Sequence, residues 1–193
     1  HIFVAGETNY GKSTLLHTFA NALLLNREIN LVIFDFKFAE FAYLEDYALV
    51  INDLDRARMV LQLLNKELDK RLMQLKRAKV RKIQRYLAKG LEMPFITLIV
   101  DELSEMRDKE CQNLLERLAR LGRAIGIHLI VATQRPSATL YEKFGDIKAM
   151  FPCRVCFLVA DRINSQMILD SDRASLLPAI PGRAIYKWGI EML

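Results

Sequence analysis

The chain has 193 residues, of which 52% are hydrophobic and 26% charged, a balance that excludes a disordered tail and a fibrous repeat. No apolar run approaches the roughly 18 residues that a membrane span requires, and three cysteines cannot build a disulfide framework, which fits a reducing cytoplasm. The length suggests one domain with a sizeable core. Because the chain enters an apolar segment at once, we expect it to be a fragment of a longer protein.

The net charge of +5 conceals a strongly basic segment. Between Lys66 and Lys89 there are ten Lys or Arg residues and two acids, so this segment carries a charge of +8. A basic stripe can attract a polyanion such as a nucleic acid, but it is also typical of a helix face in contact with water. Charge alone leaves both interpretations open.

Short apolar runs rich in Val, Ile and Phe alternate with segments of helical spacing. The runs predict strands at Ile2–Ala5, Leu31–Phe34, Phe95–Val100, Ile127–Ala132 and Val155–Val159, and their continuous apolar character is typical of a parallel sheet buried on both faces. Leucines that recur every three or four residues predict helices over Ser13–Leu25, Leu54–Ala88 and Glu110–Arg123. This alternation predicts an α/β fold with a doubly wound, mainly parallel sheet flanked by helices.

A phosphate-binding pattern, G-x-x-x-x-G-K-[ST], runs from Gly6 to Ser13, directly after the first predicted strand and at the start of a predicted helix. Such a loop points backbone N–H groups at phosphate oxygens, and the helix N-terminus adds partial positive charge. Lys12 would reach the β- and γ-phosphates, and the Ser13 hydroxyl would ligate Mg²⁺. The alternative is a glycine-rich turn with a surface lysine. The predicted cofactor-binding residues are Gly6, Glu7, Thr8, Asn9, Tyr10, Gly11, Lys12, Ser13 and Thr14.

Polar residues follow two further predicted strands. Asp101 and Glu102 come directly after Phe95–Val100, and Gln134 comes soon after Ile127–Ala132. Because ligands bind at the carboxyl ends of parallel strands, we expect these side chains to lie beside the phosphate loop. Asp101 would then hold Mg²⁺ together with Ser13, and Glu102 would act as the general base. Read alone, the acidic pair could instead begin a helix, and Gln134 could be an ordinary turn residue.

The stretch from Leu118 to Ser137, which contains Ala132-Thr133-Gln134-Arg135-Pro136, resembles the signature of the FtsK/SpoIIIE family of hexameric motors that pump double-stranded DNA. Arg162–Asp170 and Pro181–Ala184 extend the resemblance over nearly the whole chain. It implies that residues 1–193 form a single RecA-like P-loop motor domain that uses ATP and Mg²⁺. The function implied is the translocation of double-stranded DNA, in chromosome segregation or in conjugative transfer by a coupling protein of a mobile element.

The same resemblance assigns further roles. Gln134 corresponds to a sensor glutamine, and Arg123 corresponds to an arginine finger that acts on the nucleotide of a neighbouring subunit, with Arg120 and Arg154 as weaker candidates. The implied partners are double-stranded DNA, other subunits in a hexameric ring, and membrane-embedded translocation or conjugation machinery reached through regions outside this chain. The resemblance therefore implies a cytoplasmic domain of a membrane-associated protein.

The sequence also departs from the family pattern. Phe36 stands where the family usually has proline after Asp35, and Tyr10 stands where it prefers a small residue, so Tyr10 would crowd the nucleotide or contact a neighbour. Two other functions stay open: a type VII-like secretion ATPase that handles proteins, and a degenerate module that only supports a ring. His17 is interpreted as a packing residue, and Trp188 either fills an edge of the core or stacks on adenine.

Overall fold

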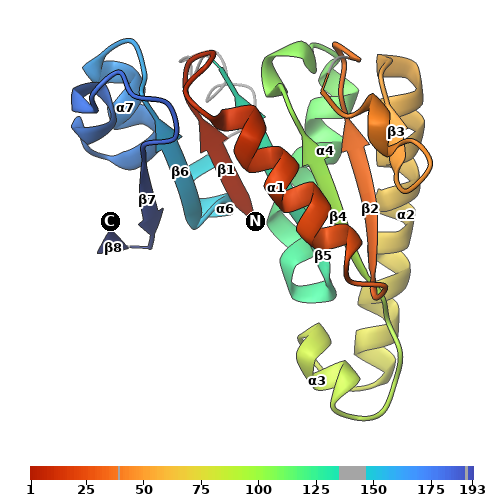
Figure 1. The fold of residues 1–193 in the computed structure, drawn as a ribbon. Helices are drawn as coiled ribbons and strands as arrows, with labels where there is room; N and C mark the ends of the chain where they lie inside the picture. The colour runs from red at the N-terminus through yellow and green to blue at the C-terminus, as the bar shows by residue number, and fades with distance from the viewer. Residues whose placement is uncertain (39, 135–146, 190) are drawn as a thin grey trace.

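The computed structural model describes residues 1–38, 40–134, 147–189 and 191–193 (Figure 1), so the end of the family signature, residues 135–137, lies outside the described residues. Its centre is an eight-stranded sheet in the order β3-β2-β4-β5-β1-β6-β7-β8. From β3 to β6 in this order, each strand pairs in parallel with its neighbour. Strand β7 pairs antiparallel with both β6 and β8. The strands are β1 (Ile2–Ala5), β2 (Ile29–Phe34), β3 (Leu49–Ile51), β4 (Phe95–Val100), β5 (Ile127–Thr133), β6 (Cys153–Phe157), β7 (Ala184–Trp188) and β8 (Glu191–Met192).

Helices cover both faces of this sheet (Figure 1). Helix α1 (Lys12–Leu24) packs on one face, and α2 (Leu54–Arg77) and α4 (Lys109–Leu121) pack together on the other. The shorter helical segments are η1 (Ala42–Leu44), α3 (Ile83–Leu87), η2 (Leu103–Glu105), η3 (Gly122–Ile125), α6 (Ile147–Met150), α7 (Arg162–Leu169) and η4 (Arg173–Leu176). The predicted α/β fold with a doubly wound, mainly parallel sheet is confirmed. Within the described ranges, no helix is both long and apolar enough to cross a membrane.

Two apolar cores result from the alternation of side chains along the buried strands. In β4, Leu98 and Val100 join the core beneath α2 and α4, whereas Ile99 joins the core beneath α1. In β1, Phe3 and Val4 divide between the two cores in the same way. Because both faces are buried, the strands read as continuous apolar runs, and the sequence therefore revealed β1 and β4 with their observed bounds.

The helix predicted over residues 54–88 is wrong, because the structure divides it into α2 and α3. After Ala78 the chain enters the left-handed region at Lys79 (φ 54°). The Val80 N–H then donates to the Leu75 carbonyl (3.0 Å), and the Lys79 N–H donates to the Lys76 carbonyl (3.0 Å), which is the Schellman pattern of helix termination. Lysine occupies the position where glycine usually signals such an end. Helix α3 consequently lies beyond the ends at which the parallel strands begin (Figure 1).

A buried arginine ties α2 to the turn before β5. Arg71 is 2% exposed, its Nη1 donates to the Ile125 carbonyl (3.1 Å), and its Nε donates to Glu67 Oε1 (2.9 Å). A guanidinium can be buried when hydrogen bonds and a carboxylate replace its water. Arg71 is therefore part of the core rather than of the basic surface that the sequence suggested.

We predict that Arg71→Ala lowers the free energy of unfolding by about 3 kcal/mol, because the buried Ile125 carbonyl and part of the Glu67 carboxylate lose their donor. Lys70→Ala is the matched control, since Lys70 pairs with the same Glu67 (3.2 Å) but its side chain is 65% exposed, so we expect little change. Urea unfolding followed by circular dichroism measures both. Equal effects of the two substitutions would contradict the role assigned to Arg71.

Candidate functional site

A cavity of about 660 Å³ lies at the carboxyl ends of the parallel strands, beside the loop that joins β1 to α1. Seven of the nine predicted cofactor-binding residues line it, and Gln134 does as well. Gly6 and Tyr10 are not among the lining residues. The lining residues are Glu7, Thr8, Asn9, Gly11, Lys12, Ser13, Thr14, Leu15, Thr18, Glu40, Gln134, Phe157, Pro181 and Gly182.

Two glycines let the loop lie directly on β6. Gly6 (φ 153°) and Gly11 (φ 112°) have positive φ, and a Cβ atom on Gly6 would lie 2.6 Å from the Cβ atom of Phe157. A Cβ atom on Gly11 would meet the Phe157 ring at 3.0 Å. Gly11 is also the N-cap of α1 and has no side chain to bond the first-turn N–H groups. These donors therefore face an anion-binding site of the kind found at helix N-termini.

Tyr10 does not crowd the cavity. Its side chain is half-buried and packs against the apolar core beneath α1, and its carbonyl accepts a hydrogen bond from the Gly182 N–H (2.9 Å). The segment Pro181–Gly182 thus closes the loop from the far end of the chain. The sequence had shown Pro181–Ala184 only as part of a family resemblance, without indicating that this segment lines the site.

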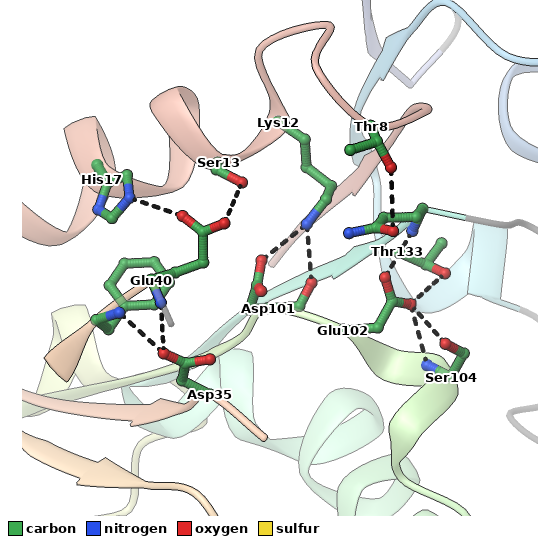
Figure 2. Close-up of polar contacts among 12 residues, drawn as sticks. Thr8, Lys12, Ser13, His17, Asp35, Glu40, Asp101, Glu102, Ser104 and Thr133 are labelled. Carbon is green, nitrogen blue, oxygen red and sulfur yellow. Dashed lines mark hydrogen bonds and ion pairs between the residues drawn. The ribbon is translucent and has the colours of Figure 1, made fainter. Parts of the chain in front are cut away.

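Lys12 and Asp101 form a buried ion pair (Figure 2). The Lys12 Nζ lies 2.8 Å from Asp101 Oδ1 and 3.2 Å from the Asp101 carbonyl oxygen, and the two side chains are 3% and 5% exposed. Burial raises the pKa of Asp101, Lys12 opposes this rise, and the carboxylates of Glu40 and Asp35 add to it. The pair brings the carboxyl end of β4 against the phosphate loop, as the sequence predicted.

Glu102 is buried, and several donors hold its carboxylate in place. Oε1 accepts hydrogen bonds from the Thr133 hydroxyl (2.8 Å), the Ser104 hydroxyl (2.8 Å) and the Ser104 N–H (3.3 Å), whereas Oε2 accepts one from the Gln134 N–H (2.9 Å). Gln134 in turn accepts a hydrogen bond from the Thr8 hydroxyl (3.3 Å) on its Oε1. Sequence reasoning missed Ser104 and Thr133, although both are hydroxyl residues within two positions of predicted site residues.

Arg123 lies at the other end of β5 from Gln134. It is exposed in η3, and the seven residues of β5 separate the two ends by about 23 Å. Arg123 therefore cannot reach the cavity of its own chain, and its role as an arginine finger stays a prediction. The candidate Arg154 is wrong, because it is buried in β6 and donates to the Ile168 carbonyl (2.8 Å) and to Asp170 (3.3 Å). Arg120 is exposed and pairs with Glu116.

The contacts of Glu40 and His17 at the site were not predicted from the sequence. Glu40 lines the cavity, and its carboxylate accepts a hydrogen bond from the Ser13 hydroxyl (3.2 Å) and contacts the His17 Nε2 (3.2 Å; Figure 2). His17, interpreted as a packing residue, is a polar partner of this acid. The one sequence feature that could have indicated a role for His17 is its spacing of four residues from Ser13, which places both on the same face of α1. Trp188 lies on β7, is 54% exposed and does not line the cavity.

The profile of the FtsK/SpoIIIE family matches residues 1–96 and 88–138. The chain belongs to this family. The DNA translocase FtsK of Borreliella burgdorferi is 34% identical over 194 residues, an alignment that covers 92% of this chain and 24% of the relative. FtsK of Helicobacter pylori strain J99 is 35% identical over 192 residues, with 92% and 22% covered. The chain thus spans about a quarter of the length of these relatives.

Solved structures share the fold of this FtsK/SpoIIIE member. The pCW3 conjugation coupling protein TcpA, in a monomer form with ATPγS, has a TM-score of 0.92 and 33% identity, and the match covers 100% of this chain and 58% of TcpA. The cytoplasmic domain of the Thermomonospora curvata type VII secretion ATPase EccC has a TM-score of 0.81 and 26% identity, with 99% and 24% covered. These likenesses confirm the P-loop ATPase fold, and family membership implies that the site uses a nucleotide.

We predict that Lys12→Ala abolishes tight binding of a fluorescent ATP analogue, because the phosphates lose the main side-chain cation of the cavity. Lys37→Ala removes the same charge from an exposed position after β2 that does not line the cavity, and it should bind as the unmodified protein does. Fluorescence anisotropy measures the affinity, and circular dichroism verifies the fold of each variant. Tight binding by Lys12→Ala would remove the phosphate-binding role from this lysine.

Proposed function

We propose that this chain is the ATP-hydrolysing motor domain of a protein that translocates double-stranded DNA. The observation that carries the proposal is the convergence of the phosphate loop, Glu102 and Gln134 at one edge of the sheet, in a chain of the FtsK/SpoIIIE family. The FtsK relatives are DNA translocases, and TcpA is a conjugation coupling protein, so chromosome segregation and conjugative transfer are the two settings that these likenesses support.

The residues of the site fit ATP and Mg²⁺. Mg²⁺ prefers oxygen ligands and commonly takes one or two protein oxygens together with phosphates and water. Ser13 and Asp101 supply a hydroxyl and a carboxylate beside the cavity, and the described residues contain no cluster of three or more acids, histidines or cysteines that could hold a metal alone. The bound ion would neutralise charge on the phosphates. Lys12, between Asp101 and the cavity, would bind phosphate oxygens.

Glu102 is suited to act as the general base. A carboxylate has about four lone-pair directions, and within the described part of the chain Oε2 accepts only the Gln134 N–H. Oε2 therefore keeps a lone pair for the proton of an attacking water, while Ser104 and Thr133 fix the other oxygen. The Gln134 side chain lies between the phosphate loop and Glu102, where it can orient that water.

Basic charge supports DNA as the substrate. Nine of the ten basic residues between 66 and 89 are exposed, and they gather on the second half of α2, the following turn and α3. Such a surface would bind phosphates without regard to base sequence. We further propose a cytoplasmic domain of a membrane-associated protein, supported by the membership of the chain in the FtsK/SpoIIIE family.

The ATPase rate of the full-length protein, with and without double-stranded DNA, tests this function. We expect DNA to stimulate hydrolysis, and we expect added salt to weaken that effect steeply because phosphate contacts release counterions. Glu102→Gln should still bind ATP but lose turnover, since an amide cannot accept the proton. A rate that responds to a secreted peptide and not to DNA would instead favour the type VII-like function, and no turnover would favour a scaffold.

We also propose a hexameric ring in which Arg123 acts on the ATP of a neighbouring subunit. Supplied in trans, such an arginine accounts for about 10³–10⁵ in rate, so Arg123→Ala should keep ATP affinity and lose most turnover. Arg120→Ala tests the weaker candidate, which is also exposed on the adjoining helix, and it should keep its turnover if Arg123 is the finger. Mixing Arg123→Ala with Lys12→Ala subunits should restore part of the activity, and normal turnover by Arg123→Ala in an assembled ring would place the finger elsewhere.

A further inference from the structure

Glu40 contacts two residues of α1 that are one turn apart. Its Oε1 accepts a hydrogen bond from the Ser13 hydroxyl (3.2 Å), and its Oε2 lies 3.2 Å from the His17 Nε2 (Figure 2). Ser13 is the residue whose hydroxyl would ligate Mg²⁺ under the proposed function. The second oxygen of Glu40 is therefore held by His17, while the first is directed at a metal-binding hydroxyl.

The chain fixes Glu40 through its backbone as well. Asp35, fully buried at the end of β2, accepts hydrogen bonds on Oδ2 from the N–H groups of Glu40 (2.9 Å) and Phe41 (2.9 Å). The buried Phe41 ring packs on the His17 ring with centroids 4.7 Å apart. Glu40 is thus anchored to β2 on one side and to α1 on the other, which distinguishes it from an ordinary surface acid.

A single tautomer of His17 gives each hydrogen bond around Glu40 both a donor and an acceptor. With the His17 proton on Nε2, that nitrogen donates to Glu40, and Nδ1 accepts from the Tyr43 hydroxyl (3.0 Å). The Tyr43 oxygen accepts in turn from the Asn21 amide (3.4 Å). Glu40 can therefore serve as an acceptor on both oxygens, and the Ser13 proton is directed to it.

A serine hydroxyl has one donor and two acceptor lone pairs. When its proton points at Glu40, both lone pairs remain for a cation in the cavity. Partners of this kind orient a ligand and raise its basicity, and their loss typically lowers metal affinity 10- to 100-fold.

We propose that Glu40 is a positioning residue for Mg²⁺ that acts through the Ser13 hydroxyl. This inference rests on the proposed ATPase function, and nucleotide binding by the unmodified protein is the measurement that separates the two. If the unmodified protein fails to bind ATPγS, the proposed function is wrong. If it binds ATPγS and substitution of Glu40 does not specifically change the Mg²⁺ dependence of that binding, only the present inference is wrong.

The experiment measures ATPγS affinity of the full-length protein in a Mg²⁺ titration and again in EDTA. For Glu40→Gln we expect the Mg²⁺ concentration at half-saturation to rise about 10-fold. Affinity in EDTA should stay the same or improve, because a negative charge near the phosphates is lost. Glu45→Gln, an exposed acid of the same loop that does not line the cavity, is the matched control and should change neither value.

A double-mutant cycle with Ser13→Ala tests whether Glu40 affects Mg²⁺ binding through the Ser13 hydroxyl. If Glu40 acts through the Ser13 hydroxyl, Glu40→Gln should shift the Mg²⁺ requirement less than twofold in the Ser13→Ala background. A full shift in that background would overturn the proposal, as would equal losses of affinity in Mg²⁺ and in EDTA, which would indicate a merely structural link between α1 and its loop. Thermal unfolding verifies the fold, and Glu40→Ala repeats the cycle should the glutamine variant be unstable.

Discussion

The buried ion pair between Lys12 and Asp101 is the contact on which the arrangement of the site depends. Strand β5 lies between β1 and β4, so these two residues meet across an intervening strand. Removing one partner of a buried pair typically costs about 3–5 kcal/mol, because the other charge is left without compensation. The start of α1 and the end of β4 are therefore held together. The same strand order places Thr133 and Gln134 beside Glu102, which explains why its donors come from the end of β5.

The sequence was informative wherever a functional residue directly follows a buried strand. The placement of the phosphate loop, Asp101, Glu102 and Gln134 at one edge was predictable, because parallel strands that are apolar on both faces stand out and their carboxyl ends share one edge. Glu40 was not predictable, since its role depends on a contact with α1 across 27 positions of sequence. The end of α2 escaped prediction for a different reason: its left-handed residue is Lys79, which carries no glycine signal.

Charge alone did not distinguish buried arginines from exposed ones. Arg71 and Arg154 look like surface residues in the sequence, yet both are buried with carbonyl and carboxylate partners. Composition cannot distinguish a guanidinium that binds a polyanion from one that donates to backbone carbonyls in a core, because both interactions use the same N–H donors. Only the fold decides, because the carbonyl groups that accept from Arg71 and Arg154 lie 54 and 14 positions away in the sequence.

Strand β5 connects the two surfaces that the proposed motor would use. Gln134 follows its carboxyl end at the nucleotide cavity, and Arg123 precedes its amino end on an exposed turn. A ring with head-to-tail contacts requires complementary surfaces at different places on each subunit, and a finger at the opposite end of a strand from the cavity meets that requirement. Because β5 is buried between β4 and β1, its two ends cannot move independently without breaking the central sheet. In the proposed ring, a shift at one subunit's cavity would therefore move Arg123, the residue proposed to act on the next subunit.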